Sequence, residues 1–326
     1  MASTNMLQDI RILVTDVDGT LLGSKPEFAL YRAFRLKIDE MRMLNRVQWV
    51  ICTGRGLRSF SSVFLPMRSF GIVPDYVITR HAYIFEKRRV GYAPHSLWNA
   101  QVLAVQWQNR VRVARAMPLL RRAVLSRLPP PFTQIAYDSG NRLLFRFEEP
   151  GAATFAAEIL TREAAPYRYL QVFHHMNEVD VRVVPFTKGL AVAALARHLR
   201  IPDRQVLVVG DGHNDISMME INLNCRTACP ANASPEVVET VHRTGGHIAK
   251  ARHLSGVLEI LSAYETGSIR SEFPEDWTPP ASISNPIRSP GGHSGPPRKG
   301  MSSLLLFLAA LYTTLLVLAS FQMVPS

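Results

Sequence analysis

The sequence predicts an α/β protein with a parallel β-sheet core, an inserted α+β cap and one C-terminal transmembrane helix. Three observations support this prediction. Apolar runs alternate with helical patterns before residue 81 and again after residue 186, the region between them has a different pattern, and residues 301–326 carry no charge. A strand–helix–strand rhythm is typical of a parallel sheet covered by helices.

The composition fits an ordered protein with an anionic partner. Hydrophobic residues make up 47% of the 326 residues and charged residues 19%, which argues against a disordered chain. The formal net charge of +11 suits a phosphorylated small molecule, a lipid surface or nucleic acid. No nucleic-acid-binding module is recognisable, so nucleic acid is not expected as a partner. The cysteines, Cys52, Cys225 and Cys229, lack the second Cys or His pair of a zinc site and fit a reducing cytoplasm.

The first part of the core is predicted in residues 1–81. Short apolar runs bounded by polar residues indicate buried strands, and the longer amphipathic stretch between them indicates a helix. The predicted strands are residues 10–14 (IRILV), 47–52 (VQWVIC) and 76–78, and the predicted helix is residues 28–45.

Residues 82–185 are predicted to form the cap. Helices are expected at 98–127 and 155–163, with strands at 142–147, 169–173 and 179–184. The first of these helices is rich in arginine, at Arg110, Arg112, Arg115, Arg121 and Arg122. The simplest interpretation is a solvated helix face; the alternative is a surface that steers anions or rests on acidic lipid headgroups.

The second part of the core is predicted in residues 186–266, where the first pattern returns. A buried strand is expected at 205–209 (QVLVV), among helices at 189–199, 216–221, 235–242 and 254–261. We expect both core parts to form one discontinuous domain that the cap interrupts.

The C-terminus is predicted to anchor the protein in a membrane. Residues 267–300 are rich in Pro, Gly and Ser, as in an extended linker. In residues 301–326 the run LLLFLAALYTTLLVLASFQMV is 21 residues long, enough to cross a hydrocarbon core of ~30 Å. Arg298 and Lys299 precede the run, so the positive-inside tendency places the catalytic body in the cytoplasm.

The strongest chemical signal is the segment Asp16-Val17-Asp18-Gly19-Thr20, which follows the first predicted strand. Two carboxylates spaced by two on an extended chain point to one side. At the carboxyl end of a strand they face the crevice where open α/β sheets bind ligands. The competing interpretation is an acidic turn that caps the next helix.

Three further segments also lie at strand or helix ends. Thr53-Gly54-Arg55 follows the second strand, Lys188 opens a helix after the cap, and Gly210-Asp211-Gly212-His213-Asn214-Asp215 follows the strand at 205–209. A helix N-terminus with an ammonium group favours an anion. The order and placement of these segments favour one shared site over the capping turn.

With these motifs the chain resembles the haloacid dehalogenase superfamily of phosphohydrolases, in the C2-capped branch with Cof-type and sucrose-phosphatase-like enzymes. The resemblance covers about residues 10–261 and rests on Asp16–Thr20, Thr53, Lys188 and residues 210–215. It implies a Rossmann-like parallel sheet core, a phosphatase activity and Mg²⁺ as cofactor, since clustered carboxylates suit that ion.

The resemblance also implies the role of each site residue. Asp16 would be the nucleophile and a metal ligand, Asp18 the general acid/base with its carbonyl on the metal, and Asp211 the other metal carboxylate. Thr53, Gly54 and Lys188 would bind the substrate phosphate. Asn214 and Asp215 would support the metal shell and Lys188, while Arg55 would contact phosphate or form a surface salt bridge.

Some residues depart from the family pattern or have a second interpretation. After residue 79, Cof-type relatives often have Asn-Gly where this chain has Arg80-His81, so substrate rules from that loop do not transfer. His213 is expected to face solvent, and His174-His175 to be structural.

The expected activity is hydrolysis of a small phosphate monoester, with a sugar phosphate as the substrate class. Two alternatives remain at this point: a non-catalytic binding protein of the same fold, and a nucleotide or cofactor phosphatase.

Overall fold

The structure is a computed structural model, and it divides into two compact units, Met1–Asn99 with Thr187–Ser326, and Ala100–Phe186. It describes residues 6–23, 28–128, 132–138, 142–167, 170–175, 177–183, 186–220, 224–274 and 277–279. Helix α4 (Ser96–Leu125) begins in the first unit and continues into the second.

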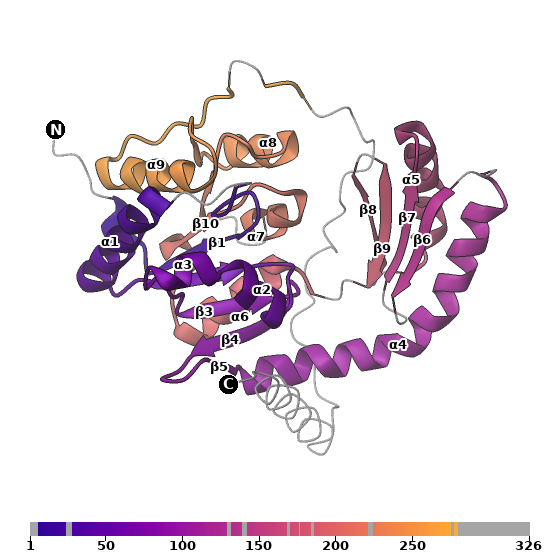
Figure 1. Ribbon diagram of the computed structural model, residues 1–326, viewed down its shortest axis with the longest axis horizontal. Coiled ribbons are helices and arrows are strands. Elements are labelled where there is room, and N and C mark those ends of the chain that lie inside the picture. Colours follow the sequence, from indigo (N-terminus) through magenta and orange to yellow (C-terminus); the bar gives the residue numbers. More distant parts are fainter. Residues whose placement is uncertain are drawn as a thin grey trace. The chain divides into compact units, whose positions relative to one another are not determined.

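In its described residues the first unit has an eight-stranded sheet in the order β12-β11-β10-β1-β2-β3-β4-β5 (Figure 1). The strands from β12 to β3 are parallel, and β4 and β5 add an antiparallel hairpin. The strands are β1 (Ile12–Thr15), β2 (Gln48–Cys52), β3 (Tyr76–Thr79), β4 (Tyr83–Lys87), β5 (Tyr92–Pro94), β10 (Val206–Val209), β11 (Arg226–Cys229) and β12 (His247–Ile248).

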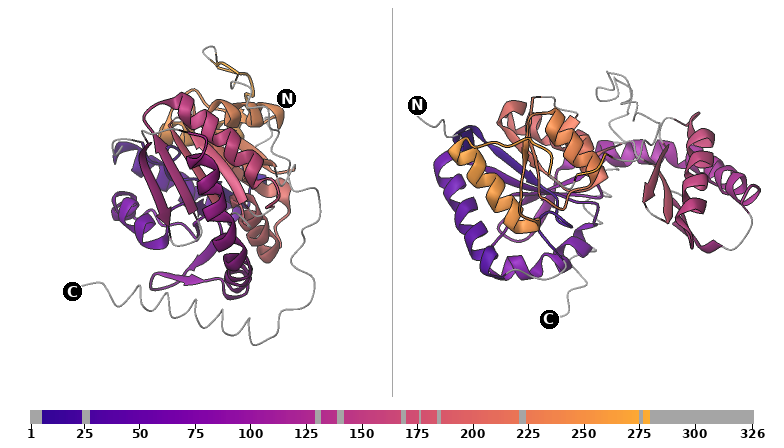
Figure 2. Two further views of the ribbon diagram at one scale, coloured as in Figure 1. Left: turned by 90° about the vertical axis from the view of Figure 1, so that its right-hand side faces the viewer. Right: turned by 90° about the horizontal axis from the view of Figure 1, so that it is seen from above.

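Helices cover both faces of this sheet (Figures 1 and 2). One face packs against α1 (Phe28–Asn45), α2 (Leu57–Val63), α3 (Leu65–Ser69) and α9 (His253–Thr266). The other packs against α6 (Lys188–Leu199), α7 (Ile216–Glu220) and α8 (Pro235–Arg243). Short 3₁₀ turns are η1 (Met6–Asp9), η2 (Asp203–Gln205) and η3 (His213–Asp215).

The alternation of β1 explains why its first three residues, Ile12–Val14, are all apolar. Leu13 packs in the cluster with α1 and α9, while Ile12 and Val14 pack in the cluster with α6 and α8. All residues of the strand are buried, as expected for a parallel strand covered on both faces. Asp16 follows at its carboxyl end, where the covering layers stop.

The second unit is an antiparallel sheet with helices on one face. The strand order is β6-β7-β9-β8, and the strands are β6 (Phe132–Asp138), β7 (Arg142–Phe147), β8 (Leu170–His175) and β9 (Glu178–Val183). Alternate residues such as Leu143, Phe145 and Val181 pack against α5 (Pro150–Ala164) and the later part of α4. The unit therefore has its own hydrophobic core.

The α/β prediction with a parallel sheet is confirmed, and the strands and helices lie close to the predicted ranges. The sequence did not predict β6, β11, β12, α2 or α3. Strands β4 and β5, which extend the large sheet, were not predicted either. The proposed division at residues 81, 185 and 266 stays a prediction.

The prediction of a membrane-anchored protein is corrected. In the part of the chain that the structure describes, no helix is long and apolar enough to cross a membrane. The described helices of sufficient length are α1, with 18 residues, and α4, with 30, and both carry charged residues along their length. Residues 301–326, on which the predicted anchor falls, lie outside the described residues. Neither the transmembrane helix nor the membrane and cytoplasmic location inferred from it is retained.

The arginine-rich part of α4 is exposed where its side chains are described. Arg115, Arg121 and Arg122 face solvent, and the side chains of Arg110 and Arg112 lie outside the described set. This agrees with a solvated helix face.

Candidate active site

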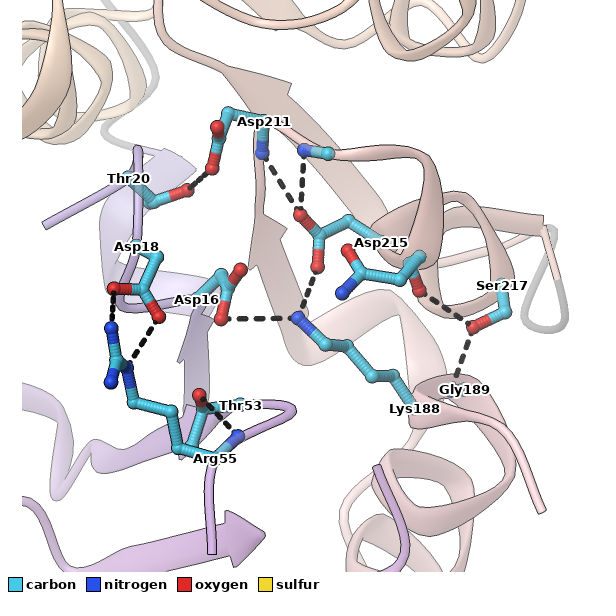
Figure 3. A network of polar contacts seen from close by, with 12 residues as sticks. Asp16, Asp18, Thr20, Thr53, Arg55, Lys188, Gly189, Asp211, Asp215 and Ser217 are labelled. Carbon is cyan, nitrogen blue, oxygen red and sulfur yellow. Dashed lines mark hydrogen bonds and ion pairs between the residues drawn. The ribbon is translucent and has the colours of Figure 1, made fainter. Parts of the chain in front are cut away.

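The site lies at the carboxyl ends of β1 and β10, which are neighbours in the sheet. Asp16 follows β1, and its amide donates a 3.1 Å hydrogen bond to the carbonyl of Val209, the last residue of β10. Asp16 is 6% exposed. Because Asp211 follows β10 after one residue, the parallel register brings two carboxylates that are distant in sequence to the same edge (Figure 3).

Lys188, the first residue of α6, binds between two of the acids (Figure 3). Its Nζ lies 3.1 Å from Oδ1 of Asp16 and 2.6 Å from Oδ1 of Asp215, and the lysine side chain is fully buried. Burial alone would lower the pKa of Lys188, but the attraction of Asp16 and Asp215 outweighs it and raises that pKa. The site therefore contains a fixed ammonium cation.

Asp215 holds the loop after β10 as well as the lysine. Its Oδ2 accepts hydrogen bonds from the backbone N–H groups of Asp211, at 3.0 Å, and Gly212, at 2.9 Å. With Oδ1 on Lys188, both oxygens of Asp215 are engaged by the protein. This arrangement makes Asp215 a support for the loop and the lysine.

Asp211 is positioned by the segment that follows β1. Its Oδ1 accepts a 2.6 Å hydrogen bond from the hydroxyl of Thr20. Gly19 has φ +79°, and a Cβ there would lie only 1.9 Å from Oδ2 of Asp211. Glycine is required at this position because it adopts positive φ readily and leaves space for the carboxylate.

The acid cluster fits a divalent cation. Asp16, Asp211 and Asp215 each offer an oxygen, and these atoms lie within 4.8 Å of one another. Burial raises the pKa of Asp16 to about 7 and that of Asp211 to about 6; the charge of Lys188 opposes this rise and that of Asp215 adds to it. Hard oxygen ligands with excess negative charge are what Mg²⁺ prefers.

Asp18 and Arg55 form a second, more exposed part of the site. Arg55 Nε and Nη2 each lie 2.7 Å from a carboxylate oxygen of Asp18, and the side chains are 34% and 51% exposed. The amide of Arg55 also donates to the hydroxyl of Thr53 at 3.1 Å. Gly54 between them is exposed, so the loop after β2 presents backbone to a ligand.

Asn214 and His213 belong to the loop after β10. Asn214 is exposed, and its carbonyl accepts from the Ser217 hydroxyl at 3.2 Å. His213 is exposed, as expected. His174 and His175 belong to β8 of the second unit.

The sequence did not predict the residues that fix the turn at Gly19. The carbonyl of Gly19 accepts from Nδ2 of Asn232 at 2.8 Å and lies 2.9 Å from Nδ1 of His253. Oδ1 of Asn232 in turn accepts from the amide of His253 at 2.9 Å. Asn232 comes shortly after β11. A polar residue that follows a further parallel strand could have indicated that Asn232 belongs to the site.

The fold and the acid cluster define the class of protein: a phosphohydrolase of the haloacid dehalogenase superfamily, as the sequence motifs predicted. The residues that carry the superfamily motifs lie together where the parallel strands end: Asp16–Thr20, Thr53, Lys188 and residues 210–215.

Comparison with known proteins gives the family. Residues 10–265 match the sucrose-6F-phosphate phosphohydrolase family. A mannosylfructose-phosphate phosphatase from Agrobacterium fabrum is 25% identical over 266 residues, which cover 78% of this chain and 97% of that protein. The chain therefore belongs to the sucrose-6F-phosphate phosphohydrolase family and is a phosphoric monoester hydrolase.

Solved structures show the same fold. A sucrose-phosphatase from Synechocystis, in complex with sucrose and phosphate, has a TM-score of 0.54 at 20% identity and covers 78% of this chain and 97% of its own. A Thermoplasma acidophilum protein has a TM-score of 0.52 at 16% identity, and the match covers 79% of this chain and 99% of that protein.

Proposed function

We propose that this protein hydrolyses the phosphate monoester of a sugar, with Mg²⁺ as cofactor and a phospho-aspartate formed at Asp16. The observation that supports this most directly is the buried carboxylate of Asp16 at a strand end, with the ammonium of Lys188 3.1 Å away. Relatives named for mannosylfructose phosphate and for sucrose phosphate favour a sugar phosphate as the substrate class.

In the first step a carboxylate oxygen of Asp16 attacks phosphorus and the ester P–O bond breaks. The leaving oxygen takes a proton from Asp18, so the sugar departs as an alcohol and an acyl-phosphate remains. Asp18, now ionised, takes a proton from a water molecule that attacks phosphorus. The acyl-phosphate P–O bond breaks, which regenerates the Asp16 carboxylate and releases phosphate.

Lys188 and the loop after β2 bind the phosphoryl group. The lysine is held by Asp215 at 2.6 Å, so its charge stays in place when Asp16 becomes esterified. The Thr53 hydroxyl and the Gly54 amide would donate hydrogen bonds to phosphoryl oxygens. Arg55 orients Asp18 through its two hydrogen bonds, and Asn214 supports the loop after β10.

Mg²⁺ would be held by Asp16, Asp211 and the backbone carbonyl of Asp18. When bound it supplies positive charge that neutralises phosphoryl oxygens and favours the ionised form of Asp16.

The test uses the full chain, Mg²⁺ and a panel of phosphorylated sugars, nucleotides and p-nitrophenyl phosphate. We expect a disaccharide phosphate to give the highest kcat/KM, and Asp16→Asn to lower it by at least about 10⁴-fold. Asp18→Asn should lower kcat by about 10²–10⁴-fold and accumulate acid-stable radiolabel from a phosphorus-32 substrate.

Equal background rates for wild type and Asp16→Asn would instead support a non-catalytic binding protein. Preference for nucleotides over sugars would support a nucleotide or cofactor phosphatase.

A further inference from the structure

The turn between β3 and β4 contains two residues that its geometry disfavours. Arg80 has φ +49° and His81 has φ +62°, and the amide of Ala82 donates to the carbonyl of Thr79 at 3.0 Å. A tight hairpin turn with two positive φ angles prefers Asn-Gly or Asp-Gly. Strained residues persist where the surroundings hold them, and they concentrate at functional sites.

The backbone of this turn is bonded to the loop after β2. The amide of His81 donates to the carbonyl of Thr53 at 3.2 Å, and the amide of Arg80 donates to the carbonyl of Arg55 at 3.0 Å. The turn thus contacts both sides of Gly54, whose amide is part of the proposed phosphate site (Figure 3 shows Thr53 and Arg55).

The side chain of His81 fills the space beside Gly54. A Cβ atom at Gly54 would lie 2.8 Å from both Cε1 and Nε2 of the imidazole. The corresponding contact of Arg80 is looser and falls on another residue, with its Nε 3.4 Å from a Cβ at Gly56. Of the two strained residues, His81 is therefore the one whose ring supports the phosphate-binding glycine.

We propose that His81 is a positioning residue for the phosphoryl group: its imidazole packs on Gly54 and fixes the direction of the Gly54 amide and the Thr53 hydroxyl. The proposal rests on the proposed phosphatase function. It explains why the turn retains a strained histidine where glycine would be relaxed, because glycine would leave the loop without lateral support.

The test compares His81→Gly with Arg80→Gly, a matched control in the same turn. Both changes relieve a positive φ, so neither should lower the melting temperature much. We expect only His81→Gly to weaken binding of inorganic phosphate in the presence of Mg²⁺, by about tenfold, as for loss of one charge-assisted hydrogen bond. Arg80→Gly should bind phosphate within about twofold of wild type.

Steady-state kinetics give a second measurement of the role of His81. Since the loop binds the phosphoryl group in both ground and transition states, His81→Gly should raise KM more than it lowers kcat. Phosphate affinity unchanged in His81→Gly, or lowered equally in both variants, would overturn the proposal. So would a wild-type protein that does not bind phosphate.

The contact itself is tested by a double-mutant cycle. Gly54→Ala should lower the melting temperature in the wild-type background and lower it less in His81→Gly, where the ring no longer occupies the space. Equal losses in both backgrounds would contradict the contact. Because calorimetric phosphate binding needs no turnover, failure of the enzymatic function is separable from failure of the positioning role.

Discussion

Two lysines of this protein are each held between two carboxylates at nearly the same distances, in very different surroundings. Lys188 in the active site lies 3.1 Å and 2.6 Å from Asp16 and Asp215. Lys37 on α1 lies 3.0 Å and 2.7 Å from Glu40 and Glu265. The side chain of Lys188 is 0% exposed and that of Lys37 is 17% exposed, with carboxylates that are 43% and 36% exposed.

Burial, and not the distance between the charged atoms, decides how much each of these ion pairs contributes to stability. Around Lys37, water screens the charges and each group remains solvated if its partner leaves. Around Lys188, low polarisability strengthens the attraction, and an isolated charge there would have no compensation. The buried set is thus suited to hold a nucleophile and a cation in fixed positions before the substrate arrives.

Lys188→Met should have the largest effect on stability. It leaves the carboxylates of Asp16 and Asp215 buried without their cation, at an expected cost of about 3–5 kcal/mol in the free energy of unfolding. Urea unfolding monitored by circular dichroism measures this. Phosphatase activity should be lost as well, because the phosphoryl charge is no longer neutralised.

The loss should be smaller at low pH, where the Asp16 carboxylate is protonated. A loss below about 1 kcal/mol at neutral pH would show that the cluster behaves as a surface pair.

The stabilisation of the folded protein by Mg²⁺ should depend on pH. Burial raises the pKa of Asp16 to about 7 and that of Asp211 to about 6. Between the ordinary Asp pKa and these values the metal-free folded state binds more protons than the unfolded chain, so its stability falls as pH rises through that window. Mg²⁺ must displace these protons, so the stabilisation that it provides should grow from about pH 5 to about pH 8.

Melting temperatures with Mg²⁺ and with chelator across this range measure the effect. Asp211→Asn should reduce the rise in melting temperature that Mg²⁺ produces. A rise that is equal at every pH would contradict the assignment of Asp16 and Asp211 as metal ligands.

Sequence alone predicted much of this site because its residues follow predicted strands. Asp16 and Asp211 follow β1 and β10, and parallel strands that are neighbours place such residues together. The contacts of Asn232 and His253 with Gly19, by contrast, join segments more than 200 residues apart, and no local pattern encodes them. The hairpin of β4 and β5 was not predicted, because short strands at a sheet edge have weak periodicity.

The exposed pair in the site gives a third, smaller prediction. Arg55→Gln removes the two hydrogen bonds to Asp18 but leaves both positions solvated, so the free energy of unfolding should change by less than about 1 kcal/mol. The kcat should nevertheless fall, by up to about 100-fold, because Asp18 loses its orientation. Steady-state kinetics beside Arg58→Gln, an exposed arginine on α2, give the matched control. Unchanged kcat would make the pair a surface salt bridge only.

Lys37→Met should have the smallest effect and is the matched counterpart of Lys188→Met. Burial lowers the pKa of Lys37, and the hydrogen bonds that its ammonium donates to Glu265 and Glu40 more than reverse this, yet all of these groups can turn to water when a partner is removed. The expected cost is about 0.2–1 kcal/mol, decreasing as salt is added, with activity unchanged. If Lys37→Met instead cost as much as Lys188→Met, the number and distance of the carboxylates, and not the burial of the lysine, would determine stability.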